Sequence, residues 1–196
     1  ILGSFAQTIM TPGSVNTPMG ITRIVREHLS DRYRYFIVEM GAYGSGSIKN
    51  LTELTPPDYA IISTIGHAHY ERFLTLENVA ETKFELGDAV MRNWAQDTEN
   101  KPRLSTSEEE EDASEAPRVI VGHKTLEYKY SKAFAEKHAG KITVVGTEDE
   151  HNLKIRDIEQ TLNGLKVRIT WKGKFYRLQS PLCGGHHALN MSLVFA

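Results

Sequence analysis

The sequence contains a single cysteine, Cys183, and no excess of either charge. Its 196 residues include 23 Lys and Arg against 25 Asp and Glu, a formal net charge of −2. One cysteine excludes an internal disulfide and fits a reducing compartment, so we expect a cytoplasmic protein. The charge balance argues against nucleic acid or an anionic membrane as a partner, because either requires a concentrated basic face.

The sequence also lacks long apolar runs and a recognisable start. No stretch approaches the ~20 apolar residues of a membrane span, so we expect no membrane insertion. The chain begins at Ile1, without an initiator Met or the basic segment of a signal peptide, and its final helical pattern runs to Ala196. With 40% hydrophobic residues it can bury one substantial core. We therefore expect residues 1–196 to be one domain of a longer protein, incomplete at both ends.

An isoleucine-rich run leads directly into two histidines and a glutamate. Residues 59–65 are preceded by two prolines and closed by a glycine, which predicts a strand buried on both faces of a parallel sheet. His67, His69 and Glu71 follow it. Polar side chains at the carboxyl end of such a strand lie where open α/β sheets bind ligands. For either histidine, capping of a turn is the alternative.

A second apolar run, residues 35–42, carries Glu39 near its downstream end. A buried carboxylate is costly unless it is paired or bound to a metal; the alternative is an edge strand with Glu39 facing water. A glycine-rich loop then opens a helix at Ser47–Leu54, whose N-terminus we expect to be exposed. Strand, helix and the isoleucine-rich strand form a right-handed parallel βαβ unit, which would place Glu39 and His69 at one sheet edge.

A long helix is predicted from Thr75 to Trp94, with Thr75 as its cap. Lys83 lies within the apolar stripe of this helix rather than opposite it. Lysines are rarely buried without a partner, and desolvation lowers the pKa of a lysine, which makes the neutral amine available for chemistry. The alternative is a lysine that reaches past the stripe to solvent.

The second half of the chain changes character twice. Residues 96–117 carry a run of Glu and Asp and are expected to form a flexible, solvated insertion. Strands follow at 118–122 and 142–146. Alternating apolar residues then predict an antiparallel β subdomain over residues 151–182, with a turn at Lys172 and Gly173. The predicted fold class is α/β, a mostly parallel sheet flanked by helices, with this small antiparallel subdomain near the C-terminal end.

Two helix starts carry polar side chains. Thr17 followed by Pro18 is typical of a helix N-cap. Near the C-terminus, a Gly-Gly turn precedes a helix with His186, His187 and Asn190 in its first turns. A helix N-terminus of this kind favours an anionic or polar ligand.

Five stretches together resemble the central domain of the Mur ligases, most closely the type that adds D-alanyl-D-alanine to a UDP-muramoyl tripeptide. They are residues 11–20, 38–42, 65–73, 79–85 and 185–190. Their order and spacing agree along nearly the whole chain, apart from the acidic insertion. The H-x-E-x-F form of His69, Glu71 and Phe73 favours this ligase type over its relatives.

The resemblance implies a P-loop NTPase-like fold that uses ATP and Mg²⁺. Glu39 and His69 would ligate one magnesium ion. Lys83 would be carbamylated, and its new carboxylate would hold a second. These three residues would therefore be the catalytic and metal-binding set.

The resemblance also implies two further groups of residues. Those that bind the nucleotide, with Asn190 against the adenine, would be Asn190, His186 and His187. Those that lie near the UDP-muramoyl peptide would be Asn16, Thr17 and Glu71. His187 and Thr17 each stand where the family more often has Asn, and Ser47 stands where Glu is usual.

The implied function is that of an ATP-dependent amide ligase of peptidoglycan precursor synthesis. A carboxylate of the UDP-muramoyl peptide would attack the γ-phosphate of ATP, and the amine of D-Ala-D-Ala would then displace phosphate from the acyl phosphate. The family's Gly-Lys-Thr phosphate loop does not occur in this sequence, so we expect this section to be inactive alone. The alternatives are a degenerate Mur-like module that binds a nucleotide-sugar or a protein partner without catalysis, and a folate- or cyanophycin-type ligase.

Overall fold

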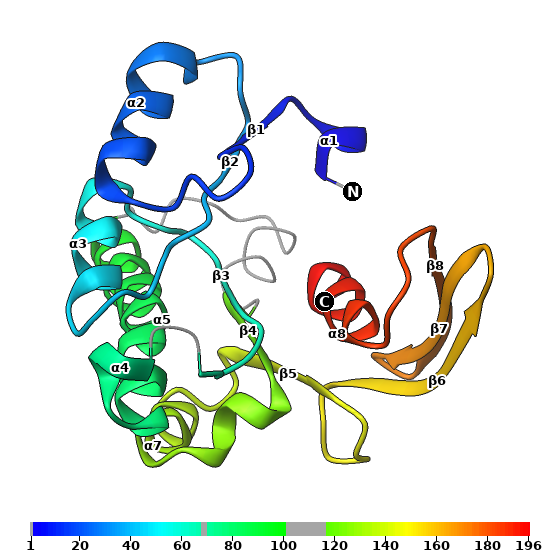
Figure 1. Ribbon diagram of the computed structural model, residues 1–196. Coiled ribbons are helices and arrows are strands. Elements are labelled where there is room, and N and C mark those ends of the chain that lie inside the picture. Colours follow the sequence, from blue (N-terminus) through cyan, green and yellow to red (C-terminus); the bar gives the residue numbers. More distant parts are fainter. Residues whose placement is uncertain (1, 68–69, 101–116) are drawn as a thin grey trace.

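The computed structural model describes residues 2–67, 70–100 and 117–196. They form a two-stranded sheet, β1–β2, and a six-stranded sheet in the order β3-β4-β5-β6-β7-β8, with helices around both (Figure 1). The elements in chain order are α1 (Leu2–Phe5), β1 (Thr8–Met10), α2 (Pro18–His28), β2 (Tyr35–Ile37), α3 (Ser47–Leu54), β3 (Ala60–Ile62), α4 (Tyr70–Phe73), α5 (Leu76–Asn100), β4 (Val119–Gly122), η1 (His123–Glu127), α7 (Lys129–Lys137), β5 (Ile142–Gly146), β6 (Leu153–Thr161), β7 (Gly164–Trp171), β8 (Lys174–Ser180) and α8 (His186–Phe195).

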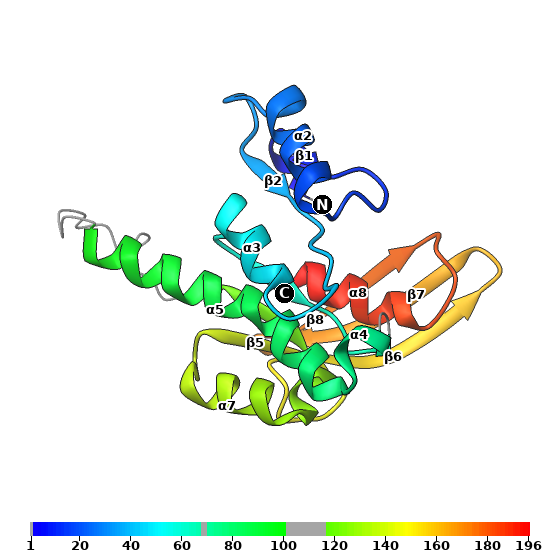
Figure 2. The same cartoon turned by 60° about the vertical axis from the view of Figure 1, so that its left-hand side comes forward.

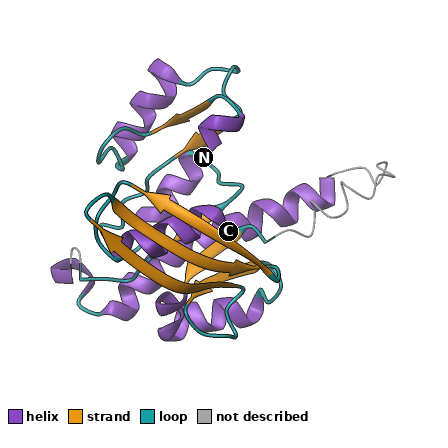
Figure 3. Cartoon of the chain, turned by 90° about the vertical axis from the view of Figure 1, so that its right-hand side faces the viewer, coloured by secondary structure: helices purple, strands orange, loops and turns teal. Residues whose placement is uncertain are grey.

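The larger sheet changes from parallel to antiparallel along its width. Strands β3 to β6 pair in parallel, and β6 to β8 pair antiparallel (Figure 3). The two parts are continuous, because Val145 of β5 is in register with Leu153 of β6. Lys172 and Gly173 join β7 to β8 with φ angles of 48° and 74°, the left-handed conformations that a two-residue hairpin turn requires. The predicted α/β class with antiparallel strands at the C-terminal end is confirmed.

Both faces of the central strands are covered by helices. Val119 and Val121 of β4 face α5 and α7, where the rings of Phe84 and Phe134 meet edge to face with centroids 5.3 Å apart. Ile120 points to the opposite face and packs with α8. In Figure 1, α5 and α7 lie on one side of β3 and β4 and α8 on the other. This alternation explains why the parallel strands read as continuous apolar runs.

The N-terminus of α3 is covered, which corrects the expectation that it is exposed. The Glu85 carboxylate of α5 accepts hydrogen bonds from the backbone N–H of Gly46 at 2.7 Å and of Lys49 at 2.8 Å. A negative charge at a helix N-terminus satisfies unpaired donors and interacts favourably with the helix dipole. This N-terminus is therefore already occupied by an anion of the chain itself.

A second carboxylate of α5, that of Glu77, caps the N-terminus of α7. Glu77 accepts from the backbone N–H of Lys129 at 3.1 Å and of Tyr130 at 2.8 Å. The Tyr130 hydroxyl donates to Asp88 at 2.5 Å, and burial, followed by this hydrogen bond, raises the pKa of Tyr130. Helix α5 is thus tied to α7 by hydrogen bonds as well as by apolar packing.

The predicted βαβ unit is wrong in one respect, since β2 and β3 lie in different sheets. In the described residues β2 pairs only with β1, and β3 pairs only with β4. Helix α3 packs Ile48 and Leu51 against α2 and Leu86 of α5 rather than onto a β2–β3 surface. The crossover therefore links two sheets, and the shared sheet edge expected for Glu39 and His69 is not formed by neighbouring strands.

The isoleucine-rich strand is also shorter and less covered than expected. Strand β3 is limited to Ala60–Ile62, and Ile61 is 46% exposed. Its register partner Ile120 packs on α8, but α8 contacts β4 to β7 and leaves the edge strand partly open. The prediction that this strand is buried on both faces is therefore wrong.

The helix that follows is longer than predicted. It begins after Thr75, whose hydroxyl accepts from the backbone N–H of Asn78 at 3.1 Å, so the predicted cap is confirmed. It continues past Trp94 to Asn100, the last described residue of this range, and projects from the body of the molecule (Figure 2). The first residues of the predicted insertion 96–117 are thus helical, and residues 101–116 lie outside the described part. No helix in the described ranges has the length and apolar character needed to cross a membrane.

The Glu77 cap can be tested by truncation. We expect Glu77→Ala to lower the free energy of unfolding by about 1 kcal/mol, because two donors of α7 lose their partner and the helix dipole loses a favourable charge. Glu81→Ala is the matched control, since Glu81 is an exposed carboxylate one turn further along α5, and should change stability by less than ~0.5 kcal/mol. The free energy of unfolding is measured with urea and circular dichroism. An equal loss of stability in Glu77→Ala and Glu81→Ala would contradict the proposed cap.

Candidate functional site

The loop between β1 and α2 and the segment between β2 and α3 meet at Glu39. Asn16, in the loop between β1 and α2, donates through Nδ2 to Glu39 Oε1 at 2.9 Å. The Glu39 backbone N–H donates to Thr11 Oγ1 at 3.1 Å, and the Gly41 N–H donates to the Asn16 carbonyl at 3.0 Å. The structure therefore brings together two residues that the sequence assigned to different roles, Asn16 to substrate and Glu39 to metal.

The position of Glu39 follows from its neighbours. Val38 and Met40 pack against the buried cluster of Ile21, Ile48 and Leu51 between α2 and α3. Because side chains alternate along an extended backbone, Glu39 between them points the other way and is exposed. It lies beyond the end of β2 at Ile37, so the alternative of a solvent-facing carboxylate describes it better than a buried one.

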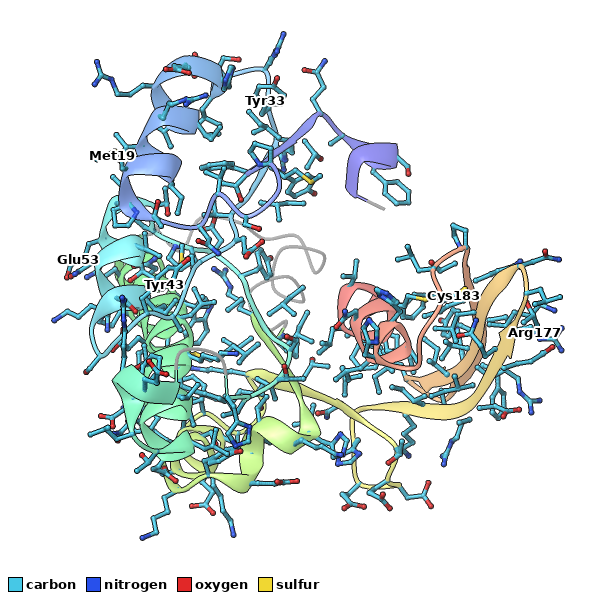
Figure 4. The ribbon with its side chains drawn as sticks, viewed as in Figure 1. Met19, Tyr33, Tyr43, Glu53, Arg177 and Cys183 are labelled. Atoms are coloured by element: carbon cyan, nitrogen blue, oxygen red, sulfur yellow. The ribbon has the colours of Figure 1, made fainter. Side chains whose placement is uncertain are left out.

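Tyr43 belongs to this site and was missed by sequence reasoning. Its hydroxyl donates to Asn16 Oδ1 at 2.7 Å. Figure 4 shows Tyr43 beside α3, whereas Arg177 and Cys183 lie on the opposite side of the molecule. The available signal was an aromatic residue inside an otherwise small, glycine-rich loop.

Thr17 caps a helix. Its Oγ1 accepts from the backbone N–H of Gly20 at 3.4 Å, and Pro18 follows as the first helical residue, which confirms the predicted cap. The hydroxyl that was assigned to substrate therefore has a structural partner at the start of α2. Its contact with a substrate stays a prediction.

Lys83 is held against the carboxyl end of β3. Its Nζ donates to the Thr64 carbonyl at 2.6 Å, and it lies between the buried Thr82 and Phe84 on α5. Burial lowers the pKa of Lys83 from its ordinary value of 10.5. The half-buried amine thus has the environment that favours its neutral form.

The third member of the predicted metal site, His69, lies outside the described residues. Glu71, which was assigned to the muramoyl peptide, is an exposed residue of α4, and its contact with a substrate stays a prediction. Across the three described ranges, no three His, Cys, Asp or Glu side chains lie close enough to hold a metal ion. The metal assignment of Glu39, His69 and Lys83 therefore stays a prediction.

The predicted nucleotide residues lie at the start of α8. The rings of His186 and His187 lie with their centroids 4.0 Å apart and their planes tilted by 43°, and Asn190 is exposed one turn later. Among the described residues no side chain caps this helix, which begins after Gly185.

The start of α8 lies close to the ends of β3 and β4. A Cβ built on Gly122 would lie 2.3 Å from the Ser63 carbonyl oxygen and 3.3 Å from Leu189 of α8. Only glycine allows this approach. The next residue after Ser63 is Thr64, whose carbonyl accepts from Lys83 of α5. Helices α5 and α8 therefore both approach the carboxyl end of β3, from opposite faces of the sheet.

The profile of the Mur ligase middle domain matches residues 1–196. The chain belongs to this family. Similar curated proteins are named UDP-N-acetylmuramoyl-tripeptide--D-alanyl-D-alanine ligase. The protein of Mycobacterium tuberculosis H37Rv is 33% identical over 99 residues, 48% of this chain and 18% of its own length. The protein of Escherichia coli K12 is 31% identical over 93 residues, which are 47% of this chain and 20% of that protein.

Other matches cover the whole chain. The Bacillus subtilis protein of the same name is 22% identical over 196 residues, which is 100% of this chain and 36% of that protein. In the match that covers all 196 residues, the chain spans about a third of the length of the curated relative, and the matches to about half of the chain cover about a fifth of theirs.

Solved structures share the fold. MurF from Acinetobacter baumannii matches 99% of this chain and 37% of its own with a TM-score of 0.74 at 18% identity. MurF from Thermotoga maritima in complex with ADP matches 98% and 38% with a TM-score of 0.68 at 19% identity. FPGS from L. casei matches 90% and 35% with a TM-score of 0.58 at 13% identity.

The close packing around Glu39 gives a test with a matched control. A Cβ on Gly41 would lie 2.3 Å from the Tyr43 ring and 3.1 Å from Asn16, whereas a Cβ on Gly44 meets no described atom within 4 Å. We expect Gly41→Ala to cost about 1–3 kcal/mol of stability through overpacking. Gly44→Ala should change it by less than ~0.5 kcal/mol. Thermal unfolding of both variants decides, and equal stabilities would contradict the described packing.

Proposed function

We propose that this chain is the ATP-binding middle domain of an ATP-dependent ligase that joins D-Ala-D-Ala to a UDP-muramoyl peptide. The observation that carries the proposal is the match of the whole chain to the Mur ligase middle domain, together with the common name of its curated relatives. ADP in the T. maritima structure supports the use of ATP. The chemistry is formation of an acyl phosphate from the substrate carboxylate, followed by attack of the D-Ala-D-Ala amine and loss of phosphate.

Glu39 has the chemistry of a magnesium ligand. Carboxylate oxygens are the donors that Mg²⁺ prefers. Oε1 accepts from Asn16, and the exposed carboxylate has a second oxygen to offer to a cation. Bound Mg²⁺ would spread the negative charge of the phosphates during transfer. Glu39 and His69 would hold this ion, and Asn16 would fix the orientation of Glu39.

Lys83 would supply a second carboxylate. Its neutral amine would attack the carbon of CO₂, form an N–C bond and release one proton, which leaves a carbamate. The lowered pKa of Lys83 supports this role because only the unprotonated amine reacts. As an ammonium group Lys83 would repel a cation, so its place in a metal site requires the carbamate.

The start of α8 would bind the nucleotide. Asn190, His186 and His187 are on this helix, whose first turns lie near the ends of β3 and β4. Asn16, Thr17 and Glu71 would lie on the side of the muramoyl peptide. Lys83 of α5, which donates to the Thr64 carbonyl beyond the end of β3, would lie close to the nucleotide side of the site.

ADP release tests the function. The protein encoded by the complete reading frame that contains this sequence is incubated with ATP, Mg²⁺, UDP-muramoyl tripeptide and D-Ala-D-Ala. We expect ADP release that depends on both substrates and falls by at least ~10-fold in Glu39→Gln, the size of loss seen when a metal site is disturbed. Glu53→Gln, an exposed carboxylate on α3, is the control and should retain activity.

Two outcomes would count against this proposal. Binding of the muramoyl peptide without any ADP release would favour a non-catalytic module. ADP release that depends on a folate or on another amino substrate instead of D-Ala-D-Ala would favour one of the other ligase types.

The carbamate on Lys83 has its own measurement. In ¹³C-labelled bicarbonate we expect a carbamate carbonyl signal in the NMR spectrum of the wild-type protein and its loss in Lys83→Ala. Lys132→Ala, which removes an exposed lysine of α7, should leave the signal unchanged. A spectrum without the signal, recorded on a protein with full ligase activity, would remove Lys83 from the proposed metal site.

A further inference from the structure

Tyr43, Asn16 and Glu39 form a chain of two hydrogen bonds. The Tyr43 hydroxyl donates to Asn16 Oδ1 at 2.7 Å, and Asn16 Nδ2 donates to Glu39 Oε1 at 2.9 Å. The three side chains come from the loop before α2 and from the segment between β2 and α3. The carboxylate at the end is the one proposed to ligate magnesium.

This series of hydrogen bonds has a direction, which the acceptor-only carboxylate of Glu39 and the Tyr43 hydroxyl set together. An asparagine side chain accepts through its oxygen and donates through its nitrogen, and the two ends can exchange by rotation of the amide. The Tyr43 hydroxyl gives its proton to Oδ1 and thereby favours the orientation in which Nδ2 faces Glu39. In the other orientation Oδ1 would face the carboxylate, and two acceptors would repel each other.

Tyr43 is itself held in place from two sides. Its backbone N–H donates to Ser47 Oγ at 3.1 Å, and the Gly44 N–H donates to the same oxygen at 3.3 Å. Its ring lies against Gly41, where a Cβ would come within 2.3 Å of a ring carbon. The hydroxyl is therefore presented to Asn16 by a loop that has little freedom to rearrange.

We propose that Tyr43 is a positioning residue that sets the Asn16 amide, and through it the Glu39 carboxylate, for binding of a divalent cation. Tyr43 does not touch the cation. This inference rests on the proposed function, since it assumes that Glu39 is a metal ligand. The glycine-rich loop would then contribute to the site through Tyr43. It would not do so through the N-terminus of α3, which Glu85 already caps.

Binding of Mn²⁺ to the protein encoded by the complete reading frame that contains this sequence tests the proposal without an activity assay. Free Mn²⁺ is measured by electron paramagnetic resonance for the wild type, Tyr43→Phe, Glu39→Gln and Tyr176→Phe. We expect Tyr43→Phe to raise the dissociation constant by about 10-fold, as for loss of a group that orients a metal ligand. Tyr176→Phe removes a hydroxyl from β8, where the ring packs on Phe195, and should leave binding unchanged.

A double-mutant cycle separates positioning from a general effect on folding. If Tyr43 acts through Asn16, then Tyr43→Phe should change the Mn²⁺ dissociation constant by less than ~2-fold in an Asn16→Ala background, since the coupled pair is already broken. A loss that is equally large in both backgrounds would overturn the proposed route. Thermal melts of all variants show whether each is folded.

The outcomes distinguish the two levels of the proposal. Mn²⁺ binding that is lost in Glu39→Gln but unchanged in Tyr43→Phe would overturn the role of Tyr43 and leave the proposed function intact. Wild-type binding that is insensitive to Glu39→Gln, or no binding at all, would overturn the metal role of Glu39 and the Tyr43 proposal with it.

Discussion

The arrangement of the molecule depends on the two carboxylates that helix α5 places against other helices. Glu77 accepts from the N-terminus of α7 and Glu85 from the N-terminus of α3. The two residues are eight positions apart, about two turns, so they lie on nearly the same face of α5. With both ends of this face bonded, α5 cannot rotate about its axis without breaking one pair of caps.

This fixed rotation is what sets Lys83. The residue lies between the two capping carboxylates in sequence, and its neighbour Phe84 is fully buried between the sheet and Phe134. The amine consequently meets the Thr64 carbonyl rather than open solvent, and burial lowers its pKa. A cap and an apolar contact made for stability thus create the environment in which a lysine can take part in chemistry.

The sequence predicted the features that depend on neighbouring residues. The helix Ser47–Leu54, the strand Ile142–Gly146, the Thr17 cap and the turn at Lys172 follow from periodicity and local hydrogen bonding. The features it could not predict join distant residues. Glu85 and Gly46 are 39 positions apart, Tyr43 and Asn16 are 27 apart, and the separation of β2 from β3 depends on how α3 packs on α2 and α5.

In the candidate site, too, the sequence identified individual residues but not the contacts between them. Residue types and motifs singled out Asn16 for a substrate and Glu39 for a metal, but gave no reason to connect them. In the structure one hydrogen bond joins the two, and the oxygen of the same Asn16 amide accepts from Tyr43. A substrate that bonded to Asn16 and rotated its amide would therefore also disturb the contact with the carboxylate. On the proposed function, this hydrogen bond between Asn16 and Glu39 would couple occupation of the peptide site to the geometry of the metal site.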